Sequence, residues 1–268
     1  MTITTRDELI DSLANRCQNL ISSKFSIGNA VLGQTFSLWR ATGQPAQAAI
    51  PAAAAVCTQA LAGAFTWTNP VSPMRSYLAR ATMMGSNNAS EIQVHDRLIH
   101  MGGLSGIVTT AQTVGTDASL TGERIGDANY SDVQWWLEWY TDTGTTAVSA
   151  TVAFTYSDNT TSTVVVALAA SQRAGRMMPI QSPVAGKFIK SIQSVTLSAT
   201  TGTAGSFGVT AMRLVTSFGL GVANTTYVAD WAQIGLPRIF DNSCLQLVCF
   251  AAGSTTGAFY GQIKLVQG

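Results

Sequence analysis

Between residues 133 and 168, large apolar side chains occupy every second position of three successive runs. In the first run, Trp135, Leu137 and Trp139 alternate with Trp136, Glu138 and Tyr140. The next two runs repeat this spacing, with Val152, Phe154 and Tyr156 and then with Val164, Val166 and Leu168. Because successive side chains of a β-strand point to opposite faces, a period of two predicts strands with one buried face each. Turn residues between the runs predict that the three strands form an antiparallel meander.

Similar strand-like runs fill most of the remaining chain from residue 75 onward, at 188–199, 207–215, 245–250 and 258–266 among others. Gly, Thr and Asn turns separate them, and no amphipathic helices intervene. This arrangement predicts a mainly β protein, with an antiparallel β-sandwich or jelly-roll-like domain over residues 73–268. No internal repeat of fixed period is visible, which argues against a propeller or a solenoid.

The first 72 residues have a different pattern. Thr5 and Glu8 are spaced as a capping box, and Leu9, Leu13, Cys17 and Leu20 form an apolar stripe at helical spacing. We therefore expect a helix over residues 6–22, followed by an extended connector over residues 26–72. The stripe could pack on the chain's own domain, but the weak periodicity of the connector favours an assembly arm. In that interpretation these four side chains contact a neighbouring subunit.

The chain carries few charges for its length. Asp, Glu, Lys and Arg make up 11% of its 268 residues, where soluble domains average about 25%. Uncharged surfaces lose little when another subunit covers them, because desolvating an ion is costly. The composition therefore favours a chain packed against copies of itself or against partners, and a homo-oligomer is expected.

Charge and hydropathy also bear on the partners. The net charge is +1 and the basic residues are scattered, so nucleic-acid binding is not expected. Three acids near the N-terminus, Asp7, Glu8 and Asp11, argue against a secretion signal. The apolar stretch over residues 45–65 is mainly alanine and is interrupted by proline, so we expect no membrane span and synthesis in a cytoplasm.

Residues that could carry chemistry are sparse. The four cysteines lack the spacing of a zinc site, and a cytoplasmic origin predicts free thiols. His95 and His100 are five positions apart, which on a regular strand places them on opposite faces and prevents a shared metal site unless a bulge intervenes. Neither a nucleophile-elbow motif nor a phosphate-binding glycine loop is present. The sequence around Ser105 is the most similar to a nucleophile elbow but does not match it. We therefore expect a non-enzymatic protein with no catalytic, cofactor-binding or metal-binding residues.

The aromatic cluster on the first strand has two interpretations. If Trp135 and Trp139 face the core, Trp136 and Tyr140 form a patch on the opposite face. A second layer or another subunit could cover this patch, or it could stack on sugar rings. The second interpretation would make the chain a lectin-like carbohydrate-binding or receptor-binding module.

Four short stretches resemble virion structural proteins of tailed bacteriophages: residues 65–72 (FTWTNPVS), 77–80 (YLAR), 96–103 (DRLIHMGG) and 109–114 (TTAQTV). The resemblance implies a component of the virion, made in the bacterial host's cytoplasm. The expected role is a head decoration or cement protein that binds the lattice of the major capsid protein or another virion subunit. A minor tail protein is the near alternative. The resemblance implies no catalytic or ligand-binding residue, and a trimer is the first expectation for the oligomer.

Overall fold

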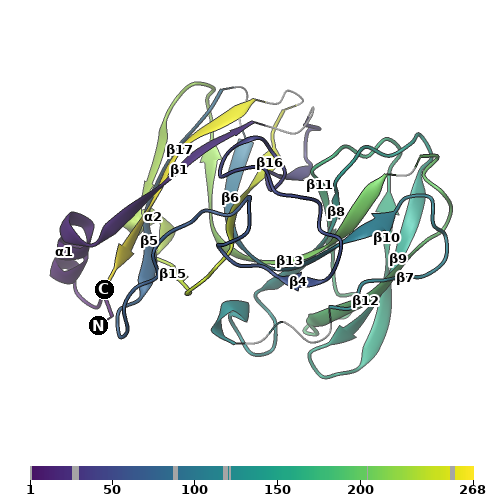
Figure 1. Ribbon diagram of the computed structural model, residues 1–268, viewed down its shortest axis with the longest axis horizontal. Helices are drawn as coiled ribbons and strands as arrows, with labels where there is room; N and C mark the ends of the chain where they lie inside the picture. The colour runs from purple at the N-terminus through teal and green to yellow at the C-terminus, as the bar shows by residue number, and fades with distance from the viewer. Residues whose placement is uncertain are drawn as a thin grey trace.

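The computed structural model describes residues 2–25, 30–86, 90–116, 120, 122–203, 205–253 and 257–268. Within these residues the protein is mainly β, and its strands form three antiparallel sheets in a barrel and sandwich arrangement (Figure 1). One short helix, α1 (Arg6–Asn15), precedes the first strand. The predicted fold class is therefore confirmed. None of the helices in the described part of the chain is long and apolar enough to cross a bilayer.

The central sheet closes on itself. Its strands follow the order β13 (Ser206–Leu220), β8 (Val133–Trp139), β11 (Arg176–Ile180), β2 (Thr35–Ser37), β16 (Leu245–Ala251), β6 (Ser90–Ser105) and β4 (Ala55–Val56). Because β6 also pairs with β13, six of these strands form a closed ring. The ring lies at the centre of Figure 1, and each of its strands has one face toward the ring interior and one face outward.

The other two sheets flank the ring. On one side lies the outer sheet, with β14 (Tyr227–Asp230), β5 (Ser76–Gly85), β17 (Ala258–Gln267), β1 (Cys17–Phe25) and β3 (Gly43–Gln44), and with β15 (Arg238–Ile239) paired to β5. On the other side lie β10 (Thr161–Leu168), β9 (Val148–Tyr156), β12 (Ile189–Leu197) and β7 (Gln112–Thr113). The remaining elements are the 3-10 turn η1 (Glu123–Ile125) and the short helix α2 (Trp231–Ile234). Two hydrophobic cores result, one on each side of the ring.

The buried faces of the three alternating strands, β8, β9 and β10, are predicted correctly, but their pairing is not. Trp135, Leu137 and Trp139 face the same core as Val152, Phe154 and Tyr156. However, β8 pairs with β11 and β13, whereas β9 pairs with β10 and β12 in another sheet. The meander is therefore wrong: β9 and β10 form a hairpin, and β8 lies across the core from them. Period-two alternation reports which face is buried and carries no information about which strand is the neighbour.

The N-terminal helix is shorter than predicted. The capping box forms, but α1 ends at Asn15, and residues from Cys17 onward pair with β17 along nine positions. Strand β1 buries Leu20, Ser22 and Lys24 on one face, and because two of these are polar the sequence hides the period of two.

Residues 2–72 are built into the fold, with 26–29 outside the described residues. They supply β1 and β3 to the outer sheet and β2 and β4 to the central sheet. The predicted boundary at residue 72 therefore does not separate an arm from a β domain, because strands from both sides of it pair with each other. Leu9 packs beneath α1 against Tyr77 and Val266, and Leu20 is buried between the outer sheet and the ring.

Candidate functional site

A buried ion pair lies in the interior of the ring. Arg97 on β6 donates from Nη2 to Oε2 of Glu138 on β8 at 2.7 Å, and both side chains are almost completely inaccessible to solvent. The same nitrogen donates to Oγ1 of Thr210 at 3.1 Å, and Nε donates to Nδ1 of His100 at 3.1 Å. The guanidinium also lies 4.7 Å from the centre of the Trp39 ring. Every charge in this cluster is therefore neutralised or hydrogen-bonded within the chain.

The electrostatics of the pair follow from this isolation. Burial lowers the pKa of Arg97, but the negative charge and hydrogen bond of Glu138, together with Tyr140 and Cys57, outweigh burial and raise it. For Glu138, burial raises the pKa, while the charge and hydrogen bond of Arg97 and the Thr210 hydroxyl lower it below the ordinary value. Both groups therefore stay ionised across the physiological pH range.

A bulge in β6 brings the histidines to the same side of the strand. Ala211 of β13 pairs with Ile99, but the next residue, Met212, pairs with Arg97, so Leu98 is the extra residue. The expectation that His95 and His100 lie on opposite faces is therefore wrong. They still form no metal site, since no group of three or more His, Cys, Asp or Glu side chains that could hold an ion occurs among the described residues. His95 instead contacts Gln93, with Nε2 2.9 Å from its Oε1.

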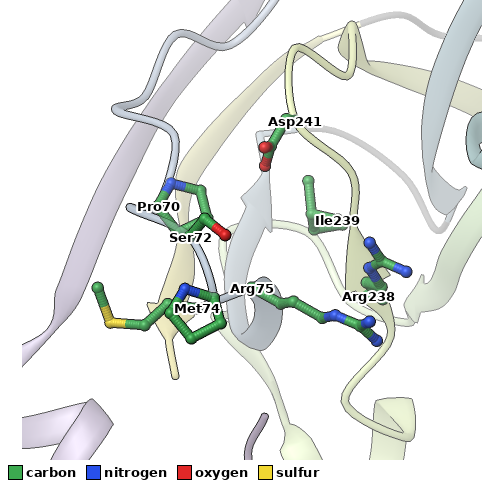
Figure 2. A pocket seen from close by; sticks show the side chains of 8 residues that line it. Pro70, Ser72, Met74, Arg75, Arg238, Ile239 and Asp241 are labelled. Atoms are coloured by element: carbon green, nitrogen blue, oxygen red, sulfur yellow. The ribbon is translucent and has the colours of Figure 1, made fainter. Parts of the chain in front are cut away.

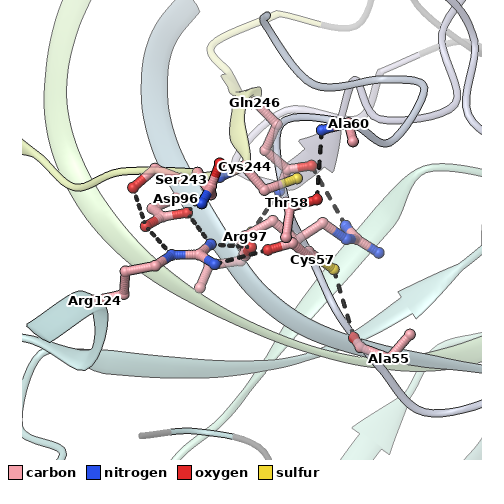
Figure 3. Close-up of polar contacts among 12 residues, drawn as sticks. Ala55, Cys57, Thr58, Ala60, Asp96, Arg97, Arg124, Ser243, Cys244 and Gln246 are labelled. Carbon is pink, nitrogen blue, oxygen red and sulfur yellow. Dashed lines mark hydrogen bonds and ion pairs between the residues drawn. The ribbon is translucent and has the colours of Figure 1, made fainter. Parts of the chain in front are cut away.

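A second ion pair lies beside the first (Figure 3). Asp96 accepts hydrogen bonds from Arg124 at Oδ1 (2.6 Å) and Oδ2 (3.0 Å), from the Ser243 hydroxyl (2.8 Å) and from the Cys244 backbone N–H (2.8 Å). Arg124 also donates to the backbone carbonyl oxygens of Cys57 and Arg97. These hydrogen bonds connect η1 and two loops to the middle of β6. The side-chain polar atoms of Asp96 and Arg124 all take part in them.

The predicted exposed aromatic patch is not present as such. Tyr140 is only 3% exposed, and burial raises the pKa of its hydroxyl. Trp136 is half-buried and packs on Met177, Met212 and Val248 in the ring interior. The prediction failed because the far side of β8 is covered by the ring itself. Trp136 does line one end of an open groove of about 500 Å³, together with Gln134, Pro179 and Lys187.

Another hollow, of about 300 Å³, lies next to β15 (Figure 2). Arg75, Arg238 and Asp241 line it, together with Pro70, Ser72, Pro73, Met74 and Ile239. The Arg238 guanidinium is already bound to Glu123 at 2.7 Å and stacks on Phe240 at 4.4 Å. The bond to Glu123 uses one guanidinium nitrogen of Arg238, and the buried Nε has no hydrogen-bond partner among the described residues.

The outer sheet has one face that the described part of the chain only partly covers. Helix α1 packs over one end of it, where Leu9 contacts Tyr77, Ala79 and Val266. Beyond the helix, Ile21 is 68% exposed, Phe25 46% and Val228 39%, and Met84 and Tyr260 are half-buried beside them. The strand registers place these residues on one side of the sheet, and Phe25 meets Tyr260 edge to face at 6.1 Å. We call this surface the apolar outer face. The sequence analysis missed it because it assigned Ile21 to a helix.

The predicted subunit-contact residues lie next to this face or beneath it. Leu9 and Leu20 are buried within the chain, and Leu13 and Cys17 are partly buried in the α1 contact. The helical stripe is therefore not formed, because the helix ends between Leu13 and Cys17. Whether this segment contacts another subunit stays a prediction, and the side chains it leaves exposed are Ile10, Ile21 and Phe25.

No family model matches the chain, and no curated protein matches it. Among solved structures, similarity is found to the VP2 subviral particle of infectious bursal disease virus, at 12% identity and a TM-score of 0.17, covering 94% of this chain and 81% of that one. The structure of the Gt strain of the same virus gives 13% identity and a TM-score of 0.16, covering 94% and 82%. At these TM-scores the similarity carries no argument about fold or function.

Proposed function

We propose that this chain is a non-enzymatic structural subunit of a tailed-phage virion, a head decoration or cement protein that binds the lattice of the major capsid protein. The observation that carries the proposal is the apolar outer face. Several exposed apolar side chains on one face of a sheet that the chain's own helix covers at only one end are typical of a protein interface. The occupant we propose is a neighbouring virion subunit.

The distribution of charge supports this proposal. The chain has few ionisable side chains, and several of them, including Arg97, Glu138 and Asp96, are neutralised inside the fold. The five side chains of the apolar outer face are uncharged, and the charged residues on the same side of the sheet, Arg80, Asp230 and Lys264, lie toward its α1 end. A partner that covers these five side chains alone desolvates no ion, which lowers the cost of forming the interface.

The resemblance to tailed-phage structural proteins supports the choice of assembly, the location in the virion and synthesis in the bacterial cytoplasm. A homotrimer is the proposed oligomer. We keep the proposal that the N-terminal segment contacts a neighbouring subunit, but with different contact residues. Ile10, Ile21 and Phe25 replace the Leu9, Leu13, Cys17 and Leu20 stripe, because these are the side chains that remain accessible.

The test is a pair of substitutions on the apolar outer face, Ile21→Lys and Phe25→Lys, in one chain. Both side chains are exposed in the isolated subunit, so the melting temperature should change little. Incorporation into particles should fall at least about tenfold, because two charges would be desolvated in the interface. Quantitative mass spectrometry of purified particles measures the occupancy.

The matched control is Val165→Lys on β10, in the sheet on the opposite side of the ring, where the valine is 63% exposed. This variant should join particles at wild-type occupancy. Normal occupancy of the Ile21→Lys, Phe25→Lys variant would refute the apolar outer face as the interface. Electron microscopy of particles with and without the chain distinguishes the head position from the alternative, a minor tail protein.

A lectin-like module is the second candidate, and the groove beside Trp136 is what favours it. An indole beside amide and ammonium groups, here those of Gln134 and Lys187, is a common setting for sugar binding. A glycan array probed with the wild type and with Trp136→Ala tests this candidate. Binding that Trp136→Ala abolishes would support it, whereas an array without a signal would remove it.

A further inference from the structure

Two cysteines that are far apart in the sequence meet at the middle of β6. Strands β4 and β16 lie end to end along the same edge of β6, with Val56 paired to Ile99 and Leu245 paired to Asp96. Cys57 follows β4 and donates its N–H to the carbonyl of Leu98 at 2.9 Å. Cys244 precedes β16 and accepts from the N–H of Arg97, also at 2.9 Å. The two cysteines therefore occupy consecutive positions of one β ladder.

Their side chains share one small core. Cys57 and Cys244 are fully buried in a cluster with Trp39, Ala48 and Ala64, and Figure 3 shows both sulfur atoms near the Arg97 side chain. A disulfide requires Cα atoms roughly 4.4 to 6.8 Å apart, a separation that neighbouring ladder positions can reach. Both thiols are free in this structure.

The surroundings make the two thiols unequal. Burial raises the pKa of Cys57, but hydrogen bonds from the Cys244 thiol and His100, together with the Arg97 charge, outweigh burial and lower it to about 5. Burial and the neighbouring Cys57 raise the pKa of Cys244. A lowered thiol pKa beside a second thiol favours oxidation of the two to a disulfide once an oxidant reaches them.

We propose that Cys57 and Cys244 form a redox pair that closes into an intramolecular disulfide when the protein meets a hydroperoxide. The Cys57 thiolate attacks one peroxide oxygen, the O–O bond breaks, and Cys57 becomes a sulfenic acid while the released hydroxide takes a proton to form water. The Cys244 sulfur then attacks the Cys57 sulfur, the S–O bond breaks, and the thiol proton leaves with the hydroxyl group as a second water. Two thiols and one hydrogen peroxide thus give one disulfide and two waters.

The consequence is a covalent bond between β4 and β16, which belong to distant parts of the chain. Such a bond restricts the unfolded chain strongly, because the loop that it closes spans most of the sequence. An oxidising environment would therefore stabilise the folded subunit without changing its surface. This role is independent of the apolar outer face and of the partner that covers it.

The experiment is a hydrogen peroxide titration of the folded full-length chain, quenched in denaturant with N-ethylmaleimide and mapped by peptide mass spectrometry. We expect a peptide pair joined through Cys57 and Cys244, lighter by two hydrogen atoms, at peroxide concentrations roughly tenfold below those that modify Cys249. Burial raises the pKa of Cys249 to about 11, so this thiol is the internal control. The oxidised protein should melt several degrees higher than the reduced one.

A variant separates the two chemical steps. In Cys244→Ser the resolving thiol is missing, so Cys57 should stop at the sulfenic acid and be trapped by dimedone, with no rise in melting temperature. If Cys57 and Cys244 remain alkylatable while Cys17 or Cys249 is oxidised, or if a different pair is joined, the proposal is wrong. The mapping of the wild-type chain decides the question even if the variant does not fold.

Discussion

The ion pair inside the ring offers the sharpest test of how this fold is held together. In Glu138→Gln, an amide of nearly the same shape replaces the carboxylate and leaves the Arg97 guanidinium buried without a counter-charge. Removing one partner of a buried pair costs about 3 to 5 kcal/mol, because the remaining charge keeps its full desolvation penalty. That loss is a large fraction of the roughly 5 to 15 kcal/mol by which domains are stable.

Urea denaturation followed by tryptophan fluorescence measures this loss, and the denaturant slope should stay unchanged. A double-mutant cycle with Arg97→Met isolates the pairwise energy. The double substitution Arg97→Met, Glu138→Gln should cost about 0.5 to 3 kcal/mol less than the sum of the single changes, since no unpaired charge remains. Hydrogen bonds to Thr210 and His100 are lost in both Arg97→Met variants, so their loss cancels from the coupling energy.

The control is the exposed pair between Arg173 and Asp142, whose side chains are about half exposed. Arg173→Met should cost no more than about 1 kcal/mol, because solvent screens the pair. If Glu138→Gln costs as little as Arg173→Met, the carboxylate does not compensate a buried charge. The description of the ring interior as a closed electrostatic unit would then be wrong.

Two buried bases should each make stability rise with pH, in two separate pH ranges. Burial lowers the pKa of His95 to about 3, so below pH 6.5 the unfolded chain binds a proton that the folded chain does not bind. The free energy of unfolding should therefore fall by about 1.4 kcal/mol per pH unit between pH 6.5 and 3. The variant His95→Gln should lack this part of the slope in acid denaturation curves. Burial lowers the pKa of Lys24 from 10.5 to about 8, and its ammonium group donates to the carbonyl oxygens of Ala41 and Ala46. Below pH 8 this lysine is charged in both states and destabilises the fold by up to about 3 kcal/mol, a penalty that disappears as pH rises toward 10.5. Urea midpoints at pH 7.5 and 9.5 should therefore rise more for the wild type than for Lys24→Met, and equal rises would contradict the role given to Lys24.

Several parts of the fold were predictable because they depend on local periodicity. Trp135, Leu137 and Trp139 alternate with Trp136, Glu138 and Tyr140, and the structure buries the first three on one face as expected. The capping box at Thr5 and Glu8 is a local hydrogen-bond pattern and also forms. Both signals depend on residues close in sequence, for which no knowledge of the rest of the chain is needed.

The pairing of the strands was not predictable in the same way. Strand β1 carries Ser22 and Lys24 on its buried face, so its alternation is invisible to a hydrophobicity argument. Its partner β17 lies at the other end of the sequence, and nothing near Cys17 identifies that partner. The helical stripe from Leu9 to Leu20 was therefore a coincidence of spacing across a helix and a strand.

The closed ring explains why the candidate site was misassigned. Alternation correctly placed Trp136, Glu138 and Tyr140 on the face opposite the core, and an open two-layer sandwich would have exposed that face. Closure through the β6 and β13 pairing converts it into a second interior, in which a glutamate needs Arg97 as a partner. The signal that could have indicated this was the charged Glu138 between two bulky aromatic residues, which is unusual for an exposed strand face.

The stretch over residues 96–103, which resembles phage structural proteins, has a role inside the subunit. Its Asp96, Arg97 and His100 hold the two ion-pair clusters, and a Cβ at Gly102 would collide with the Pro51 carbonyl oxygen. The hydrogen bonds of Asp96, Arg97 and His100 and the close approach at Gly102 are all made within one subunit. None of the four residues needs a partner chain for these contacts. A sequence pattern of this kind marks how the subunit folds, whereas the recognition of a partner that we propose depends on Ile21, Phe25 and the rest of the apolar outer face. Substitutions in the stretch should therefore reduce stability first and incorporation only as a consequence, while substitutions on the apolar outer face should do the reverse.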